Sequence, residues 1–271
     1  MAHIRSVTNL VPQPVRFGLR RLAFAGAGRT CPLCGNGVRA FKPHGGGAEV
    51  LERRRVVGGM RREADRCPVC HGCDRTRMMM LYLEREAGVG RVDGGGPKRV
   101  LHVAPDYGLY LWLRRQKGVA YTGTDIDATR YRHIENMRSA DLTAAPFPDD
   151  AFDIVICSHV LEHVPDDARA LGEIRRILAP GGHALLLTPL ALDGLGTDED
   201  PALHDPVEQD RRFGQWDHVR IYGRDDFLAR MRAAGFETRA VDPFEAWPEA
   251  AKELHLNPLE ILPVGTKPAR T

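Results

Sequence analysis

Long apolar runs are missing from this sequence. No stretch approaches the length that crosses a lipid bilayer, and the first residues lack the apolar core of a secretory signal peptide. These absences argue against a membrane protein or a secreted one, so we expect a cytoplasmic location. The chain has 271 residues, of which 43% are hydrophobic. That is enough to bury one sizeable core and a smaller appendage.

A strong net charge is also missing, because the formal charge is only +2 at pH 7. The balance hides an asymmetry, since residues 1–100 hold 19 Lys and Arg against 8 Asp and Glu and the rest of the chain is acidic. A basic segment of this kind can face nucleic acid, an acidic substrate or the acidic remainder of its own chain. Residues 1–30 mix basic and apolar side chains, and we interpret them as a lead-in that packs on the next module rather than as an RNA-binding arm.

Cysteine is scarce, but the six cysteines are grouped, which in an intracellular chain favours a metal site over disulfides. Two Cys-Pro-x-Cys turns each point two sulfurs at one ion, and four thiolates suit a tetrahedral, structural Zn²⁺. The expected ligands are Cys31, Cys34, Cys67 and Cys70. Cys73 and His71 lie close enough to replace one of them, whereas we place His44 outside the site. Reduced cysteines without a metal are the alternative.

The zinc-knuckle module is expected to span residues 31–90. Its last part, from Asp74 to about Glu86, has the spacing of a helix that begins at an aspartate cap and ends before Gly88. We expect this helix to connect the metal module to the larger domain, with its methionines in the core rather than at a cofactor. A glycine-rich linker at Asp93–Pro97 then follows.

The stretch from Arg99 to Asp127 is the central feature of the larger domain. Apolar residues up to Val103 indicate a buried strand, and a helix of suitable spacing follows from Tyr107 to Lys117. A second strand should end at Asp125. An acidic residue at that distance is placed to bind the two hydroxyls of a ribose. The stretch therefore predicts half of a nucleotide-type binding site.

The alternation of strands and helices continues along the chain. Phe152–Cys157 and Ala184–Leu187 are typical of buried strands, and the helix between them begins at Pro165 and should end at Pro180-Gly181-Gly182. Such alternation predicts an α/β fold with a Rossmann-like, doubly wound, mostly parallel sheet.

Two further features lie beyond the last of these strands. Phe236–Val241 and Glu260–Val264 are expected to add an antiparallel hairpin at the sheet edge. Residues 189–222 interrupt the rhythm with prolines, acids, histidines and aromatics. A segment of that length in a compact domain is usually functional, and we interpret it as a substrate lid.

Three side chains are candidates for a catalytic base. His163 and His218 each follow an acidic residue in sequence, and Tyr222 is the third candidate. Neighbours in a helix do not face each other, so the Glu162-His163 pair is no evidence of a dyad, and a structural role for His163 stays open. Arg220 would suit an anionic acceptor.

Taken in order, the motifs LHVAPDYG, GTDID, ADLTAAPFPDDAFD, ICSHVLEHV and LAPGG resemble those of class I S-adenosylmethionine-dependent methyltransferases. The resemblance covers residues 98–271. The segment CPVCHGCDRTRMMMLYLE is similar to that of a bacterial subgroup in which the methyltransferase domain follows a cysteine-bearing segment. This resemblance implies a methyltransferase with S-adenosyl-L-methionine as its methyl donor.

The resemblance also implies which residues bind the cofactor. The family's first loop starts from an acid and carries several glycines, whereas here His102 replaces the acid, so we expect Asp106 to take over its role. Backbone N–H groups at the start of the following helix are expected to face the methionine carboxylate. Asp125 corresponds to the ribose ligand and Asp141 to the acid at the adenine amine, with a plain helix cap as the alternative for Asp141. The full implied set is His102, Ala104, Pro105, Asp106, Tyr107, Asp125, Ile126, Asp141, Leu142, Ser158 and His159.

Three functions fit these observations. The first is direct SN2 methyl transfer to a small-molecule acceptor, for which alignment of the reactants matters more than a general base. The second is an RNA methyltransferase that docks nucleic acid on the basic run Arg53–Arg66. The third is a non-catalytic protein that binds the cofactor. The basic module lacks the interleaved aromatics of a base-stacking surface, which favours the first.

Overall fold

A computed structural model describes residues 12–91 and 96–269 of the chain. The expected linker at Asp93–Pro97 and the first part of the expected lead-in lie largely outside the described residues. None of the described helices is long and apolar enough to cross a membrane.

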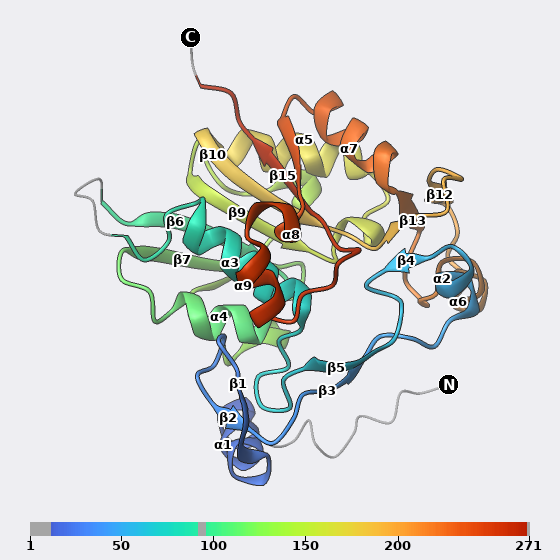
Figure 1. The fold of residues 1–271 in the computed structure, drawn as a ribbon. Helices are drawn as coiled ribbons and strands as arrows, with labels where there is room; N and C mark the ends of the chain where they lie inside the picture. The colour runs from blue at the N-terminus through green and yellow to red at the C-terminus, as the bar shows by residue number, and fades with distance from the viewer. Residues whose placement is uncertain (1–11, 92–95, 270–271) are drawn as a thin grey trace.

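A seven-stranded sheet forms the centre of the molecule (Figure 1), with strands in the order β14-β15-β10-β9-β6-β7-β8. The strands are β6 (Lys98–Val103), β7 (Val119–Asp125), β8 (Met137–Ser139), β9 (Phe152–Ser158), β10 (Leu178–Leu187), β14 (Glu237–Val241) and β15 (Leu262–Thr266). β8, β7, β6, β9 and β10 are mutually parallel, and β15 runs antiparallel to both of its neighbours. The Rossmann-like fold class and the antiparallel hairpin are confirmed.

Helices cover both faces of this sheet (Figure 1). They are α3 (Asp74–Arg85), α4 (Tyr107–Leu113), α5 (Asp167–Ile177), α7 (Arg224–Ala233), α8 (Pro243–Ala246) and α9 (Pro248–Glu253). Successive strand residues point to opposite faces, so Val100 packs in the core beneath α3 and α4 while Leu101 packs beneath α5 and α7. The apolar runs of the sequence are therefore strands that are buried on both sides.

Two helix ends differ from the sequence prediction. The helix that begins at Tyr107 ends at Leu113 rather than Lys117. The helix after Pro165 ends at Ile177, and Pro180-Gly181-Gly182 lies within β10. The pairing of β10 with β9 shifts register between Leu178 and His183, so an irregularity in the strand accommodates these residues.

The N-terminal segment is built from short elements. They are α1 (Gln13–Ala23), β1 (Ala25–Thr30), β2 (Gly37–Val38), β3 (Lys42–His44), α2 (Glu49–Arg53), β4 (Val56–Val57) and β5 (Arg62–Arg66). β1 pairs with β2 and β3 pairs with β5, both antiparallel.

The expected lid at 189–222 is not a single loop. It contains β11 (Leu190–Ala191), β12 (Asp198–Glu199), α6 (Pro206–Phe213) and the start of β13 (Arg220–Gly223). These strands form a small sheet in the order β12-β13-β11-β4, so a strand of the N-terminal segment pairs with the lid. The N-terminal segment and residues 189–222 lie beside each other in Figure 1, at one side of the molecule.

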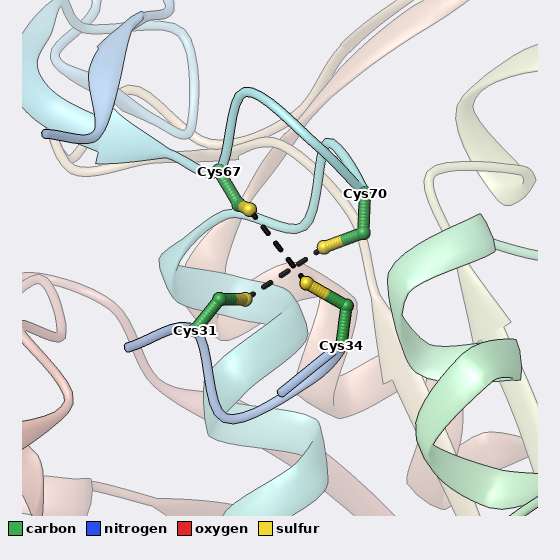
Figure 2. A group of neighbouring side chains, drawn as sticks. All are labelled: Cys31, Cys34, Cys67 and Cys70. Carbon is green, nitrogen blue, oxygen red and sulfur yellow. Dashed lines mark hydrogen bonds between the residues drawn. The ribbon is translucent and has the colours of Figure 1, made fainter. Parts of the chain in front are cut away.

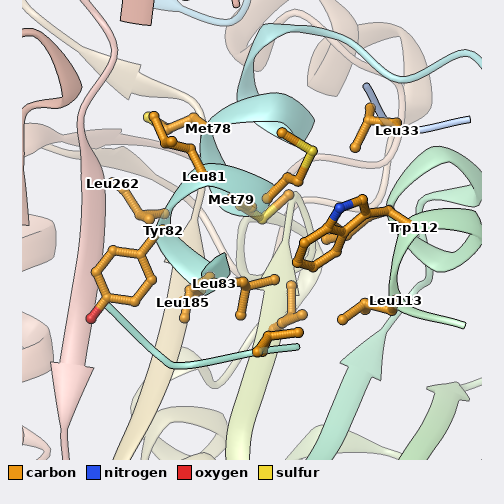
Figure 3. Packing of buried hydrophobic residues seen from close by; sticks show 14 of the residues in the cluster. Leu33, Met78, Met79, Leu81, Tyr82, Leu83, Trp112, Leu113, Leu185 and Leu262 are labelled. Atoms are coloured by element: carbon orange, nitrogen blue, oxygen red, sulfur yellow. The ribbon is translucent and has the colours of Figure 1, made fainter. Parts of the chain in front are cut away.

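Helix α3 shares one hydrophobic core with the metal module and the sheet (Figure 3). Its residues Met78, Met79 and Leu83 pack with Leu33 from the first cysteine turn and with Trp112 from α4. The methionines are core residues, as predicted. The helix begins at a capping box made by Cys73 and Thr76, so Cys73, not Asp74, is its cap. The domain division at residue 98 stays a prediction.

Candidate functional site

The four predicted metal ligands converge on one point (Figure 2). The sulfur atoms of Cys31 and Cys70 lie 3.7 Å apart and those of Cys34 and Cys67 lie 4.0 Å apart, and all four side chains are buried. Sulfurs bound to one tetrahedral Zn²⁺ at about 2.3 Å stand about 3.8 Å from one another. These two separations are close to those of thiolates around one zinc ion, so the four cysteines suit such a site.

The two alternative ligands have other roles. The Cys73 sulfur lies 3.6 Å from the Thr76 hydroxyl at the start of α3, outside the four-cysteine cluster. His71 has a left-handed backbone (φ 64°) and donates its N–H to the carbonyl of Cys67, which closes the second cysteine turn. The structure therefore brings together the four cysteines that the spacing selects.

A cavity of about 450 Å³ opens at the carboxyl ends of β6 and β7. Asp125 ends β7 as expected, and its Oδ1 accepts the N–H of Asp127 at 2.9 Å. Of the expected cofactor residues, four line this cavity: Asp125, Ile126, Asp141 and Leu142. The position is the one at which open α/β sheets bind their ligands.

Asp141 is a helix cap, and its expected role at the adenine stays a prediction. Its Oδ1 accepts the N–H and the hydroxyl of Thr143, both at 2.8 Å, so it caps the short 3₁₀ helix Leu142–Ala144. These bonds hold the pKa of Asp141 below its usual range. The same carboxylate lies in the wall of the cavity and is charged at neutral pH.

Val103, the last residue of β6, lines the 450 Å³ cavity, but no residue of the loop that follows it does. His102 is buried, its Nε2 accepts the N–H of Asp106 at 3.4 Å, and burial lowers its pKa to about 3. His102 is therefore neutral and holds the loop through its hydrogen bond with the Asp106 N–H. Ala104 has φ 44°, a left-handed conformation that the glycine-rich loops of the family adopt more easily.

The start of α4 makes contacts that compete with one expectation for this loop. The N–H groups of its second and third residues, Gly108 and Leu109, donate to Asp106 Oδ1 at 2.8 and 3.2 Å. Because Asp106 caps its own helix, these groups are not free to face the cofactor's methionine carboxylate. The cofactor roles of Ala104, Pro105, Asp106 and Tyr107 stay predictions.

A second cavity, of about 300 Å³, adjoins the first. His163 lines both cavities and so marks their junction. The N-terminal segment supplies one wall through His44, Leu51, Gly58, Gly59 and Arg75. A β-carbon placed on Gly58 would lie 3.4 Å from Arg75 Nη1 and 3.6 Å from His159 Cε1, so this wall contacts the sheet end directly.

The residues after β9 face this second cavity rather than the first. His159, expected at the cofactor, lines the second cavity, and Ser158 lines neither. His163 and His218 stand edge to face with their ring centres 4.6 Å apart. The carboxylate of Glu162 lies with them, since one donor atom from each of the three side chains falls within 4.8 Å of the others. The structure therefore brings together two of the three expected catalytic residues.

Tyr222 is not part of this group. Its side chain is fully buried, and its hydroxyl donates to Asp167 Oδ2 at 2.7 Å. Burial raises the pKa of Tyr222, so it cannot act as a base at neutral pH. The expectation of a catalytic Tyr222 is wrong because the side chain points into the core beneath α5 and α7.

Arg220 is also committed to the fold. Its buried guanidinium donates to the carbonyls of Leu161 and Pro165 at 3.0 and 2.9 Å, and it pairs with Glu199 at 3.0 Å. It holds the turn that carries Glu162 and His163, and four of its five N–H groups are engaged there and at Glu199. Arg75, which the sequence did not single out, is the cation that reaches the second cavity. Its position depends on contacts far apart in the chain, so no local pattern marks it.

A Rossmann-like sheet with an acid at the end of its second strand, beside two adjoining cavities, is the arrangement in which open α/β folds bind nucleotide-like ligands. Residues 75–249 match the methyltransferase domain family, and the chain belongs to it. It is a class I S-adenosylmethionine-dependent methyltransferase.

Three relatives show the extent of the similarity. The uncharacterized methyltransferase YcgJ of Bacillus subtilis is 37% identical over 102 residues, which are 37% of this chain and 38% of the relative. The demethylmenaquinone methyltransferase of Thermus thermophilus is 37% identical over 125 residues, covering 42% and 52%. The 27-O-demethylrifamycin SV methyltransferase of Amycolatopsis mediterranei is 30% identical over 119 residues, covering 42% and 41%. The chain thus spans about half or less of the length of these relatives.

Proposed function

We propose that this enzyme transfers the methyl group of S-adenosylmethionine to a small, negatively charged acceptor held in the 300 Å³ cavity. The observation that carries the proposal is the pair of adjoining cavities that share His163. In the first compartment, Asp125 and Asp141 are the acids proposed for the ribose and the adenine. The second compartment has a wall from the N-terminal segment and is lined by the guanidinium of Arg75. Two of the relatives are named for small-molecule substrates, which supports the same class.

The residues of the first compartment fit the cofactor. Asp125 is 8% exposed, and its carboxylate stands at the end of β7 where the two ribose hydroxyls would donate to it. Asp141 offers an acceptor for the adenine amine, and Leu142 and Ile126 supply apolar contact for the ring. The bound cofactor supplies a methyl group already activated on a sulfonium. The protein's task is then to align the acceptor and exclude water, and alignment is worth up to about 7–11 kcal/mol.

Arg75 makes the second compartment suitable for an anion. The side chain is half-buried in the cavity wall, and no described residue forms a hydrogen bond or ion pair with its guanidinium. A planar guanidinium can bind a carboxylate or phosphate through two parallel hydrogen bonds. His163 and His218 stay the candidates for the groups that contact the acceptor's nucleophilic atom.

The RNA alternative loses part of its support in the structure. Arg54 is buried and pairs with Asp193 at 2.7 Å, and Arg62 pairs with Asp74. Arg66 donates to the carbonyl of His71 at 3.3 Å. Several cations of the run expected to dock phosphates therefore hold the N-terminal segment together instead.

The proposal is tested with methyl-labelled S-adenosylmethionine and two sets of acceptors. One is a panel of small phenols, hydroxy acids and quinols with carboxylate or phosphate groups, and the other is bacterial RNA. We expect label in the small acids. Label in RNA alone, with an affinity that falls steeply as salt rises, would show the alternative to be right.

Replacing Arg75 with methionine should raise KM for the methylated acid roughly tenfold, because one charge-assisted contact is worth about 1.5–3 kcal/mol and this one is partly solvated. The value of kcat should change little, since the guanidinium holds the acceptor and not the reacting atom. Steady-state kinetics check this. Arg53→Met removes an exposed charge from the same module outside the cavity and is the matched control. An equal change in both variants would assign the effect to net charge.

A further inference from the structure

Two histidines and a glutamate converge in the wall of the acceptor compartment. One donor atom each from Glu162, His163 and His218 lies within 4.8 Å of the other two. In a tetrahedral site with bonds of about 2.1 Å the ligand atoms stand about 3.4 Å apart, so metal binding would draw the three side chains closer together. We propose that this trio binds a divalent transition-metal ion, separate from the four-cysteine zinc centre.

Glu162 is the strongest sign of a missing positive charge. Its side chain is fully buried, and neither carboxylate oxygen accepts a hydrogen bond from the described residues. His159 Nδ1 lies 3.2 Å from Oε1, but without hydrogen-bond geometry. A buried carboxylate left in this state is costly unless a cation or donors compensate it.

The charges around the cluster agree with that view. Burial raises the pKa of Glu162, but the facing imidazoles of His159, His163 and His218 outweigh it and hold the pKa at about 2. Burial lowers the pKa of His159 and of His218, and Arg75 lowers that of His159 further. Metal binding would require the carboxylate of Glu162 in its charged form and the two ligating imidazoles in their neutral form.

The histidines are arranged as metal ligands usually are. His163 Nδ1 lies 3.2 Å from the carbonyl oxygen of Asp217 and 3.4 Å from its carboxylate. Because a carbonyl only accepts, Nδ1 must carry the proton and Nε2 keeps its lone pair. A ligating histidine typically donates its other N–H in this way. His218 Nδ1 is buried without a partner among the described residues.

The donor set points to a class of ion and to its use. Two imidazoles and one carboxylate favour a first-row transition ion over Mg²⁺ or Ca²⁺. Three protein ligands leave coordination positions open toward the cavity. If the proposed function holds, an acceptor oxygen would occupy one of them and lose its proton to water more easily. That oxygen's lone pair then forms the bond to the methyl carbon, while the carbon–sulfur bond breaks and its electron pair stays on sulfur.

The test is a calorimetric titration of Co²⁺ into the untagged, full-length, zinc-loaded protein without methyl donor or acceptor. We expect one Co²⁺ per chain in addition to the structural zinc, with no thiolate–cobalt absorption. Glu162→Gln and His218→Gln should each weaken Co²⁺ binding at least tenfold. His204→Gln, which changes an exposed histidine of the lid, should have no effect.

Absence of Co²⁺ binding, or equal binding in all variants, would overturn the cation site. Should Glu162→Gln fail to fold, as thermal unfolding would show, His218→Gln and wild type decide the question alone. Because the titration contains neither substrate, a negative result leaves the methyl-transfer proposal standing. Conversely, failure of the methylation assay does not alter the Co²⁺ isotherm.

Discussion

Replacing Cys70 with serine should abolish stoichiometric zinc and lower the free energy of unfolding by several kcal/mol. Structural zinc sites contribute about 10–16 kcal/mol of apparent binding energy at pH 7, which rivals the total stability of an ordinary domain. The loss should be global, because the cysteine turns share a hydrophobic core with α3 and the sheet. Zinc analysis together with thermal unfolding measures both effects.

The matched control is Cys73→Ser. This cysteine is buried three residues beyond Cys70, but it caps α3 and lies outside the four-cysteine cluster. A serine can fill the same capping role. The variant should therefore keep one zinc per chain and a near-normal unfolding temperature. If Cys73→Ser loses zinc while Cys70→Ser keeps it, the assigned ligand set is wrong.

Loss of zinc should also weaken binding of S-adenosylmethionine, because the metal site abuts the loop after β6. A β-carbon on Gly108 would lie 3.3 Å from the Cys70 sulfur and 3.1 Å from Gly72 Cα. The Thr76 hydroxyl donates to Asp106 Oδ2 at 3.3 Å, which ties the cap of α4 to the start of α3. The metal module thus supports the loop after β6, and a weaker binding of S-adenosylmethionine without zinc would favour the predicted cofactor role of that loop.

The features that the sequence predicts correctly are those with local signals. The spacing of the two Cys-Pro-x-Cys turns predicts which four cysteines come together. The apolar strand run and the length of the helix after it predict that the second strand ends at Asp125. Alternating strands and helices leave few arrangements of the sheet, so its parallel order is predictable. For Asp141 the structure shows the cap that was the alternative to its expected adenine role, since an acid before a short polar turn readily accepts the N–H two residues on.

The features that the sequence does not predict depend on contacts between distant segments. β4 pairs with β11, although Val57 and Leu190 are far apart in the chain, and this pairing brings the N-terminal segment beside the second cavity. Arg220 and Tyr222 have the chemistry of a site, yet β13 turns both inward to hold carbonyls and Asp167. Residue type alone does not say which side of a short strand faces the cavity. Arg75 was not predicted because its place at the second cavity depends on contacts between segments far apart in the chain.

Replacing Asp125 with alanine should weaken binding of S-adenosylmethionine about 100-fold. The carboxylate is the one acid at the end of β7 that is largely buried, and two hydrogen bonds from ribose hydroxyls to a charged acceptor are worth about 3 kcal/mol together. Asp125→Asn keeps an oxygen for the Asp127 N–H and one ribose hydroxyl, so its loss should be nearer tenfold. Calorimetry with the cofactor alone measures both constants.

Asp127→Ala is the control for this series, because it removes the same charge two residues away. Its carboxylate is directed at Thr129, which it binds at 3.1 Å through the N–H and 2.5 Å through the hydroxyl, and it does not line the cofactor cavity. Less than a twofold change is expected, because an exposed charge at this distance is screened by water and salt. A graded loss through asparagine to alanine at 125, with none at 127, would show that Asp125 acts through direct hydrogen bonds and not through the local charge. Equal losses at both positions would contradict the assignment of Asp125 as the ribose ligand, and a wild-type protein that binds no cofactor at millimolar concentration would contradict the cofactor cavity itself.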